Sequence, residues 1–114
     1  MEKYNEETKK KFQNLTQLGQ ALELLTQQKR QIDSNIRETE LALEELEKAS
    51  PDTVVYKQIG GIMIKRERNK LLDEKKSDKE TLNMRSNTLA QKIERTKSTF
   101  ENMQKSLQAD LQNQ

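Results

Sequence analysis

The chain has 114 residues, of which 35% are charged, 31% are hydrophobic and 4% are aromatic, a length that allows at most one ordinary domain. Leu, Ile, Val and Phe together supply 24 of the 114 residues, near the limit at which a chain stops burying enough apolar surface to fold alone. The formal net charge of +2 is too small for self-repulsion to enforce disorder. The composition therefore excludes an ordinary packed globule. It favours a chain that is either largely disordered, or elongated and sharing its hydrophobic core with partner chains.

Missing residue types exclude several kinds of site. The chain contains no Cys and no His, which removes thiolate and imidazole metal ligands, Cys nucleophiles, Ser-His triads and His general bases. We therefore predict no catalytic residue, no cofactor site and no metal site, and we do not expect an enzyme. The longest apolar run, Ile59–Ile64, is too short to cross a membrane. The first residues show no secretory signal, so a soluble, cytoplasmic protein is expected.

Residues 1–50 carry an apolar repeat that is typical of a coiled-coil helix. With Leu15 at position a of a heptad, ten of fourteen a and d positions are hydrophobic. We call the a and d positions of the chain its heptad seam. In this segment the seam consists of Met1, Tyr4, Thr8, Lys11, Leu15, Leu18, Leu22, Leu25, Lys29, Ile32, Ile36, Thr39, Leu43 and Leu46. The pattern predicts a helix with one apolar stripe and a solvated back.

Residues 51–65 have a different character. Ser50-Pro51-Asp52 interrupts the helical pattern, and two β-branched runs then flank a Gly-Gly pair. Because Gly supplies the positive φ of type I′ or II′ turns, the segment predicts a β-hairpin. Two strands alone are marginal and expose two edges, so we expect pairing with hairpins of other chains; a connector folded onto the coiled coil is the alternative. The predicted assembly residues are Val54, Val55, Tyr56, Ile59, Gly60, Gly61, Ile62, Met63 and Ile64.

Residues 66–114 contain neither Gly nor Pro and keep the heptad with a thinner apolar stripe. With Leu72 at position a, the seam continues through Arg68, Leu72, Lys75, Lys79, Leu82, Ser86, Leu89, Ile93, Thr96, Phe100, Met103, Leu107, Asp110 and Gln114. The two separately fitted heptads agree on one antiparallel register, in which Leu15 faces Met103 and Ile36 faces Leu82. The expected fold is mainly α: a long antiparallel two-helix coiled coil with one β-hairpin at the helix–helix connection.

The two ends of the chain are expected to meet at a free tip. Helices of about 45 residues would be about 70 Å long, so the tip would lie far from the hairpin. Frayed ends rich in Gln and Asn leave apolar side chains partly exposed. The apolar residues at the tip, which would touch unfolded or apolar partners, are Met1, Tyr4, Phe12, Leu107 and Leu111. Ordinary end fraying is the alternative.

The run Val55–Lys65, preceded by Leu43–Leu46 and a Pro-Asp break and flanked by heptad helices, resembles the β-type subunit of the prefoldin family. The resemblance covers essentially the whole chain, and the single hairpin matches the β-type rather than the α-type subunit. It implies one prefoldin-like domain over residues 1–114. Its parts would be the coiled-coil helices 1–50 and 66–114 and the assembly hairpin 51–65.

The resemblance also implies partners and an activity. The family forms a hexamer of two α-type and four β-type subunits, in which hairpins pair into β-barrels and the coiled coils hang from this platform. Its tips hold unfolded polypeptide without ATP and pass it to a group II cytosolic chaperonin. By this resemblance the client contacts would be Tyr4, Phe12, Phe100, Met103, Leu107 and Leu111. Phe100 and Met103 also lie on the seam, where core packing would explain them. Neither a nucleic acid nor a membrane is an expected partner.

Two other functions compete with this interpretation. A structural coiled-coil tether or scaffold would use the helices to bind partner helices and the hairpin only to dimerise. Nucleic-acid binding is disfavoured, because the basic bias is confined to residues 51–76 and is typical of the solvated start of a helix. A closed six-subunit particle would distinguish the chaperone from the tether.

Overall fold

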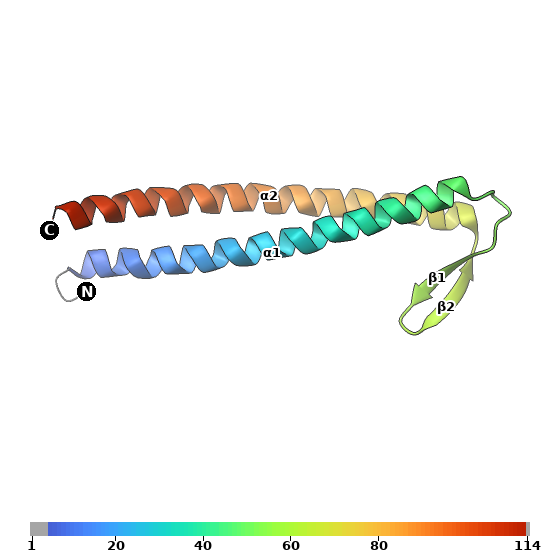
Figure 1. Cartoon of the computed structure of the whole chain (residues 1–114), viewed down its shortest axis with the longest axis horizontal. Coiled ribbons are helices and arrows are strands. Elements are labelled where there is room, and N and C mark those ends of the chain that lie inside the picture. Colours follow the sequence, from blue (N-terminus) through green and yellow to red (C-terminus); the bar gives the residue numbers. More distant parts are fainter. Residues whose placement is uncertain (1–4, 114) are drawn as a thin grey trace. The chain divides into compact units, whose positions relative to one another are not determined.

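The computed structural model describes residues 5–113. In chain order it contains helix α1 (Glu6–Lys48), strand β1 (Val55–Ile59), strand β2 (Ile62–Arg66) and helix α2 (Arg68–Gln112), as Figure 1 shows. This confirms the predicted fold class, two long helices joined by a two-stranded antiparallel hairpin.

The chain forms two compact units. Unit 1 combines Met1–Arg30 with Asn87–Gln114, and unit 2 is Gln31–Ser86, which includes the hairpin. Each unit therefore contains a segment of α1 and a segment of α2. The single domain predicted over residues 1–114 stays a prediction.

Local signals set the two ends of α1. At its start, the Asn5 Oδ1 accepts a hydrogen bond from the backbone N–H of Thr8 at 2.8 Å, which caps the helix. Two glutamates in the first turn add negative charge where the helix dipole favours it. The helix ends at Lys48 because Ser50 precedes Pro51, and a residue before proline is disfavoured in the helical conformation.

The predicted heptad seam is the covered stripe of both helices. Among residues 5–113, no seam residue is exposed. The seam residues that are buried include apolar and polar side chains: Thr8, Thr39, Leu43, Leu46, Ser86 and Leu107. The heptad repeat thus identified the covered stripe of each helix even at positions where the residue is polar.

Polar contacts across the helix pair confirm the antiparallel arrangement inside each unit. In unit 1, the Lys11 Nζ donates to the Asp110 Oδ2 at 2.5 Å. In unit 2, the buried Ser86 hydroxyl donates to the Asp33 Oδ1 at 2.7 Å. Asp33 lies next to Ile32, and the register that pairs Ile36 with Leu82 also places Ile32 opposite Ser86. The polar seam residues Lys11 and Ser86 are therefore hydrogen-bonded, as expected for covered polar groups.

The start of α2 differs from the prediction in two ways. The helix begins at Arg68, since Arg66 is still the last residue of β2 and pairs with Val55. The heptad placed Leu72 on the seam, yet it is Leu71 beside it that is buried, with 6% of its surface exposed. Glu74, three residues after Leu71 and so on the same face, is ion-paired with the hairpin. A face of α2 beside the seam therefore contacts the hairpin through Glu74, which the two-helix pattern could not include.

Candidate functional site

The hairpin is regular and its turn is tight. Its register runs from the pair Val55 and Arg66 to the pair Ile59 and Ile62. Gly60 has a φ of 59°, whereas Gly61 does not have a positive φ. A positive φ at the first turn residue alone is the sign pattern of a type II′ turn, which matches the twist of antiparallel strands. The structure thus selects one of the two predicted turn types.

The two faces of the hairpin differ in exposure. Directly opposed residues share a face, so Val55, Lys57 and Ile64 lie on one face, and these three are half-buried. We call this the inner face. The outer face carries Tyr56, which is 54% exposed, and Met63, which is 64% exposed. Figure 1 shows the hairpin of unit 2 standing apart from the helices toward its turn.

An ion pair fixes the inner face against α2. The Lys57 Nζ donates to the Glu74 Oε1 at 2.7 Å. This hydrogen bond holds the pKa of Glu74 below its ordinary value of 4.5; partial burial opposes the shift, and the positive charge of Lys57 adds to it. The Glu74 side chain is 41% exposed, so solvent screens the pair and its main effect is to orient the hairpin.

Arg68 joins the first turn of α2 to the end of α1. Its Nε donates to the backbone oxygen of Leu46 at 2.8 Å, and its second terminal nitrogen, Nη2, donates to that of Glu47 at 3.3 Å. Carbonyls in the last turn of a helix lack partners within the helix, so the guanidinium caps α1. The sequence had placed Arg68 only on the seam. No local signal could have shown this role, because the two helix ends are separated by the hairpin.

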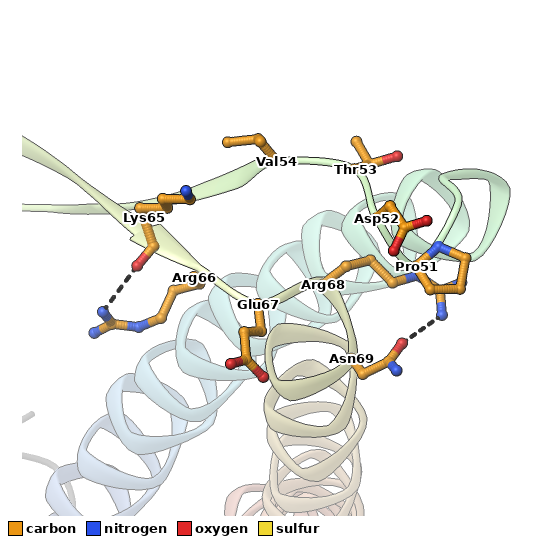
Figure 2. Close-up of a pocket in the computed structure, with 9 residues that line it drawn as sticks. All are labelled: Pro51, Asp52, Thr53, Val54, Lys65, Arg66, Glu67, Arg68 and Asn69. Carbon is orange, nitrogen blue, oxygen red and sulfur yellow. Dashed lines mark hydrogen bonds between the residues drawn. The ribbon is translucent and has the colours of Figure 1, made fainter.

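An open pocket of about 480 Å³ lies at the base of the hairpin in unit 2 (Figure 2). In it, the Arg66 Nη1 donates to the Lys65 backbone oxygen, and the Arg68 Nη1 donates to the Asn69 Oδ1 at 2.9 Å. Its lining residues are Pro51, Asp52, Thr53, Val54, Lys65, Arg66, Glu67, Arg68 and Asn69. Because the two arginines of the pocket already bond to oxygens of the chain itself, we assign the pocket a role in positioning the hairpin.

Most of the predicted assembly residues are exposed. The exposed apolar ones are between 42% and 64% exposed: Val54, Tyr56, Ile59, Ile62 and Met63. Gly60 and Gly61 are exposed in the turn, whereas Val55 and Ile64 are half-buried on the inner face. The structure thus gathers large apolar side chains on a small sheet whose two edges have no strand neighbour within residues 5–113. Their role in assembly stays a prediction.

The predicted tip residues are more covered than expected. Tyr4 lies outside the described residues. Phe12, Phe100, Met103 and Leu111 are half-buried, and Leu107 is buried, with 5% of its surface exposed. All five belong to unit 1, and their role in binding partners stays a prediction. Leu107 and Leu111 line an open groove along α2 together with charged and amide side chains.

Two further features are absent from residues 5–113. There, no three carboxylates lie close enough together to hold a metal ion. Within the same range, neither helix has a stretch that is long and apolar enough to cross a membrane.

The fold and the exposed hairpin define a class: coiled-coil proteins whose two helices are connected through a small, apolar β-hairpin. Within this class, a family model described as "Prefoldin subunit" matches residues 5–114. The chain belongs to the prefoldin family of chaperone subunits, which confirms the resemblance seen in the sequence. Membership implies assembly with other prefoldin subunits.

Similar proteins are β subunits of archaeal prefoldins. The chain is 37% identical to the prefoldin subunit beta of Archaeoglobus fulgidus over 94 residues, covering 82% of this chain and 81% of the relative. It is 35% identical to that of Methanosarcina acetivorans over 97 residues, covering 85% and 83%. The crystal structure of the prefoldin beta subunit from Thermococcus strain KS-1 superimposes with a TM-score of 0.84 at 28% identity, over 92% of each chain.

Proposed function

We propose that this chain is the β-type subunit of a hexameric prefoldin that holds unfolded polypeptides without ATP and transfers them to a group II chaperonin in the cytoplasm. One observation carries the proposal. The hairpin exposes five large apolar side chains and two strand edges, in a family whose subunits assemble with one another. The hexamer would contain two α-type and four β-type subunits.

The hairpin is the proposed assembly element. A two-stranded sheet is marginal in water, and exposed strand edges readily pair with further strands. Pairing with neighbouring hairpins would satisfy the backbone groups of both edges and cover the outer face, including Tyr56 and Met63. Lys57 and Arg68 would support this contact indirectly, because they fix the hairpin and the helix ends before assembly.

The helix ends in unit 1 are the proposed client-binding tips. Half-buried apolar side chains give weak individual contacts, and several arms on one platform raise the local concentration for each further contact. Met103 suits such a surface, because its flexible thioether adapts to irregular partners. The proposed client contacts are Tyr4, Phe12, Phe100, Met103, Leu107 and Leu111. Of these, Leu107 would reach a client only where the helix ends open, since it is buried.

Binding without ATP agrees with the sequence. The chain has no Gly-Lys-Ser or Gly-Lys-Thr segment, and Gly60 and Gly61 form the hairpin turn rather than a phosphate-binding loop.

The first test combines mass and activity. Light scattering would measure the chain alone and mixed with an α-type prefoldin subunit, and each sample would be tested for suppressing aggregation of an unfolded enzyme without ATP. A six-subunit particle that suppresses aggregation supports the proposal. A stable dimer that is indifferent to the α-type subunit and inert toward unfolded protein refutes it and favours a tether.

The second test concerns the tips. Deleting residues 1–12 and 104–114 should leave the hexamer intact and abolish suppression of aggregation. A full-length variant, Phe12→Gln with Leu111→Gln, keeps the Lys11–Asp110 ion pair and removes only half-buried apolar surface. Suppression that survives in both variants would contradict the tip assignment.

A further inference from the structure

The chain has few side chains that oxidise readily. It contains no Cys and no Trp, and its sulfur atoms belong to four methionines: Met1, Met63, Met84 and Met103. Met1 lies outside the described residues. Mild oxidation therefore acts on this chain chiefly through the thioether groups of methionine.

The three methionines within residues 5–113 differ in exposure and position. Met63 is 64% exposed in β2, and Met84 is 67% exposed on α2. Met103 is half-buried on the heptad seam. A dissolved oxidant must reach the sulfur atom, so the exposed methionines react before the covered one. Met63 and Met84 are thus about equally accessible, but only Met63 lies on the hairpin.

Met63 supplies a large part of the apolar surface on the outer face of the hairpin. Two opposed pairs form this face, Tyr56 with Lys65 and Gln58 with Met63. Tyr56 and Met63 are its apolar strand residues, and both are more than half exposed. If Met63 lost its apolar character, Tyr56 would be the one apolar strand residue left on this face.

Oxidation of the thioether changes this character. A lone pair of the Met63 sulfur attacks one oxygen of hydrogen peroxide, an S–O bond forms as the O–O bond breaks, and water leaves. The sulfur loses the two electrons that the peroxide gains. The product, methionine sulfoxide, carries a polar oxygen in place of an apolar surface.

The sulfoxide is tolerated in the free subunit and unfavourable in an assembled one. On the exposed outer face, water hydrates the new oxygen. Pairing with a neighbouring hairpin would displace this water, while the backbone N–H groups nearby are used in the strand ladder. Burial of a polar group without a hydrogen bond costs free energy, so the sulfoxide opposes pairing.

We propose that Met63 is a site of reversible oxidation that controls entry of the chain into the hexamer. Peroxide oxidises Met63 in the free subunit, and the sulfoxide keeps the hairpin from pairing. In the assembled complex, the neighbouring hairpin shields the sulfur. A methionine sulfoxide reductase reverses the change: two thiols supply two electrons, the oxygen leaves as water, and the thioether returns. The inference rests on the proposed function, because it takes the hairpin as the assembly element.

Peroxide treatment of the free subunit tests the proposal. The chain would be treated with hydrogen peroxide, freed of it and mixed with an α-type subunit. Peptide mass spectrometry would measure the sulfoxide at Met63 and at Met84. Light scattering over a dilution series would give the concentration at which the complex dissociates. Met63→Leu cannot form the sulfoxide, and Met84→Leu is the matched control, because it removes an equally exposed methionine from α2.

Oxidation should raise the dissociation concentration of the wild-type chain and of Met84→Leu by about tenfold, the effect of burying one polar group without a partner. Treatment with the reductase should restore the original value. The dissociation concentration of Met63→Leu should be the same before and after peroxide. If peroxide weakens Met63→Leu as much as the wild-type chain, another residue is responsible and the proposal is overturned.

A second measurement tests the shielding of Met63 by assembly. Peroxide added to the assembled complex should oxidise Met84 and leave most of Met63 unmodified, whereas the free subunit should be oxidised at both. Equal oxidation of Met63 in the free and assembled states would show that the sulfur is not covered, which contradicts the proposal.

Failure of this inference differs from failure of the proposed function. If the untreated chain joins the complex and the oxidised chain joins it at the same concentration, assembly stands and the switch at Met63 is refuted. If the untreated chain forms no particle with the α-type subunit, the proposed assembly itself fails.

Discussion

Replacing Ile62 and Met63 by threonine tests whether the apolar surface of the hairpin drives assembly. In the free subunit these side chains are 60% and 64% exposed, so the hairpin loses little packing when they are shortened. Threonine is β-branched and keeps the preference for a strand. The variant therefore removes apolar surface while it preserves the fold.

The size of the effect follows from the exposed fractions. Complete burial of an Ile or Met side chain contributes about 1.5–3 kcal/mol. With more than half of each side chain still exposed, about 1–2 kcal/mol per residue remains to be gained on assembly. The double variant should thus lose about 2–4 kcal/mol per subunit, a factor of about 30 to 1000 in the association constant.

Light scattering over a dilution series would measure this loss, with the α-type subunit present. Circular dichroism would show whether the helices of the free subunit still unfold at the same temperature. Leu41→Gln is the control, because Leu41 is 62% exposed on α1, outside the hairpin. If the hairpin variant and the control dissociate at the same concentration, the exposed apolar surface of the hairpin does not drive assembly.

Three further predictions concern the stability of unit 2. Arg68→Met should destabilise the chain by about 1–2 kcal/mol in urea unfolding, since it leaves α1 carbonyls uncapped; an unchanged midpoint would contradict the capping role. The folded pKa of Glu74 is depressed by Lys57, so its contribution is present above the ordinary value of 4.5 and is lost as the pH falls through the depressed value. Glu74→Gln should therefore destabilise the chain near neutral pH and not in acid, and a penalty that is constant over a pH series of urea unfolding curves would refute this. Gly60→Ala should lower the free energy of unfolding by about 1–2 kcal/mol in thermal unfolding, because Gly60 has a positive φ. Gly61→Ala should be nearly neutral, because a Cβ at Gly61 would point into open space. Equal effects of the two variants would show that the turn is not type II′.

The helices were predictable because their signal is repeated along the chain. Each turn of a coiled coil adds another a or d residue, so even Thr8, Thr39 and Ser86 could be assigned to the seam by position. The hairpin was predictable for another reason. Two β-branched runs around a Gly-Gly pair allow hardly any other local structure.

The candidate site was only partly predictable. The exposure of the hairpin residues was predictable, because two short strands form too small a sheet to bury their apolar side chains. Sequence reasoning missed the open groove in unit 1 that is lined by Asn14, Gln17, Leu18, Ala21 and Met103. No local pattern shows that Met103 of α2 lies beside Asn14 and Ala21 of α1 in this groove.

The sequence by itself thus determined the element order, the seam and the hairpin, because each depends on residues that are close together in the chain. Tertiary structure alone decided the contacts between distant residues. The Lys57–Glu74 ion pair and the capping of α1 by Arg68 exist only once the hairpin and the helix ends meet. The burial of Leu71 was likewise decided by the three-dimensional packing, since the heptad places Leu72 and not Leu71 on the seam.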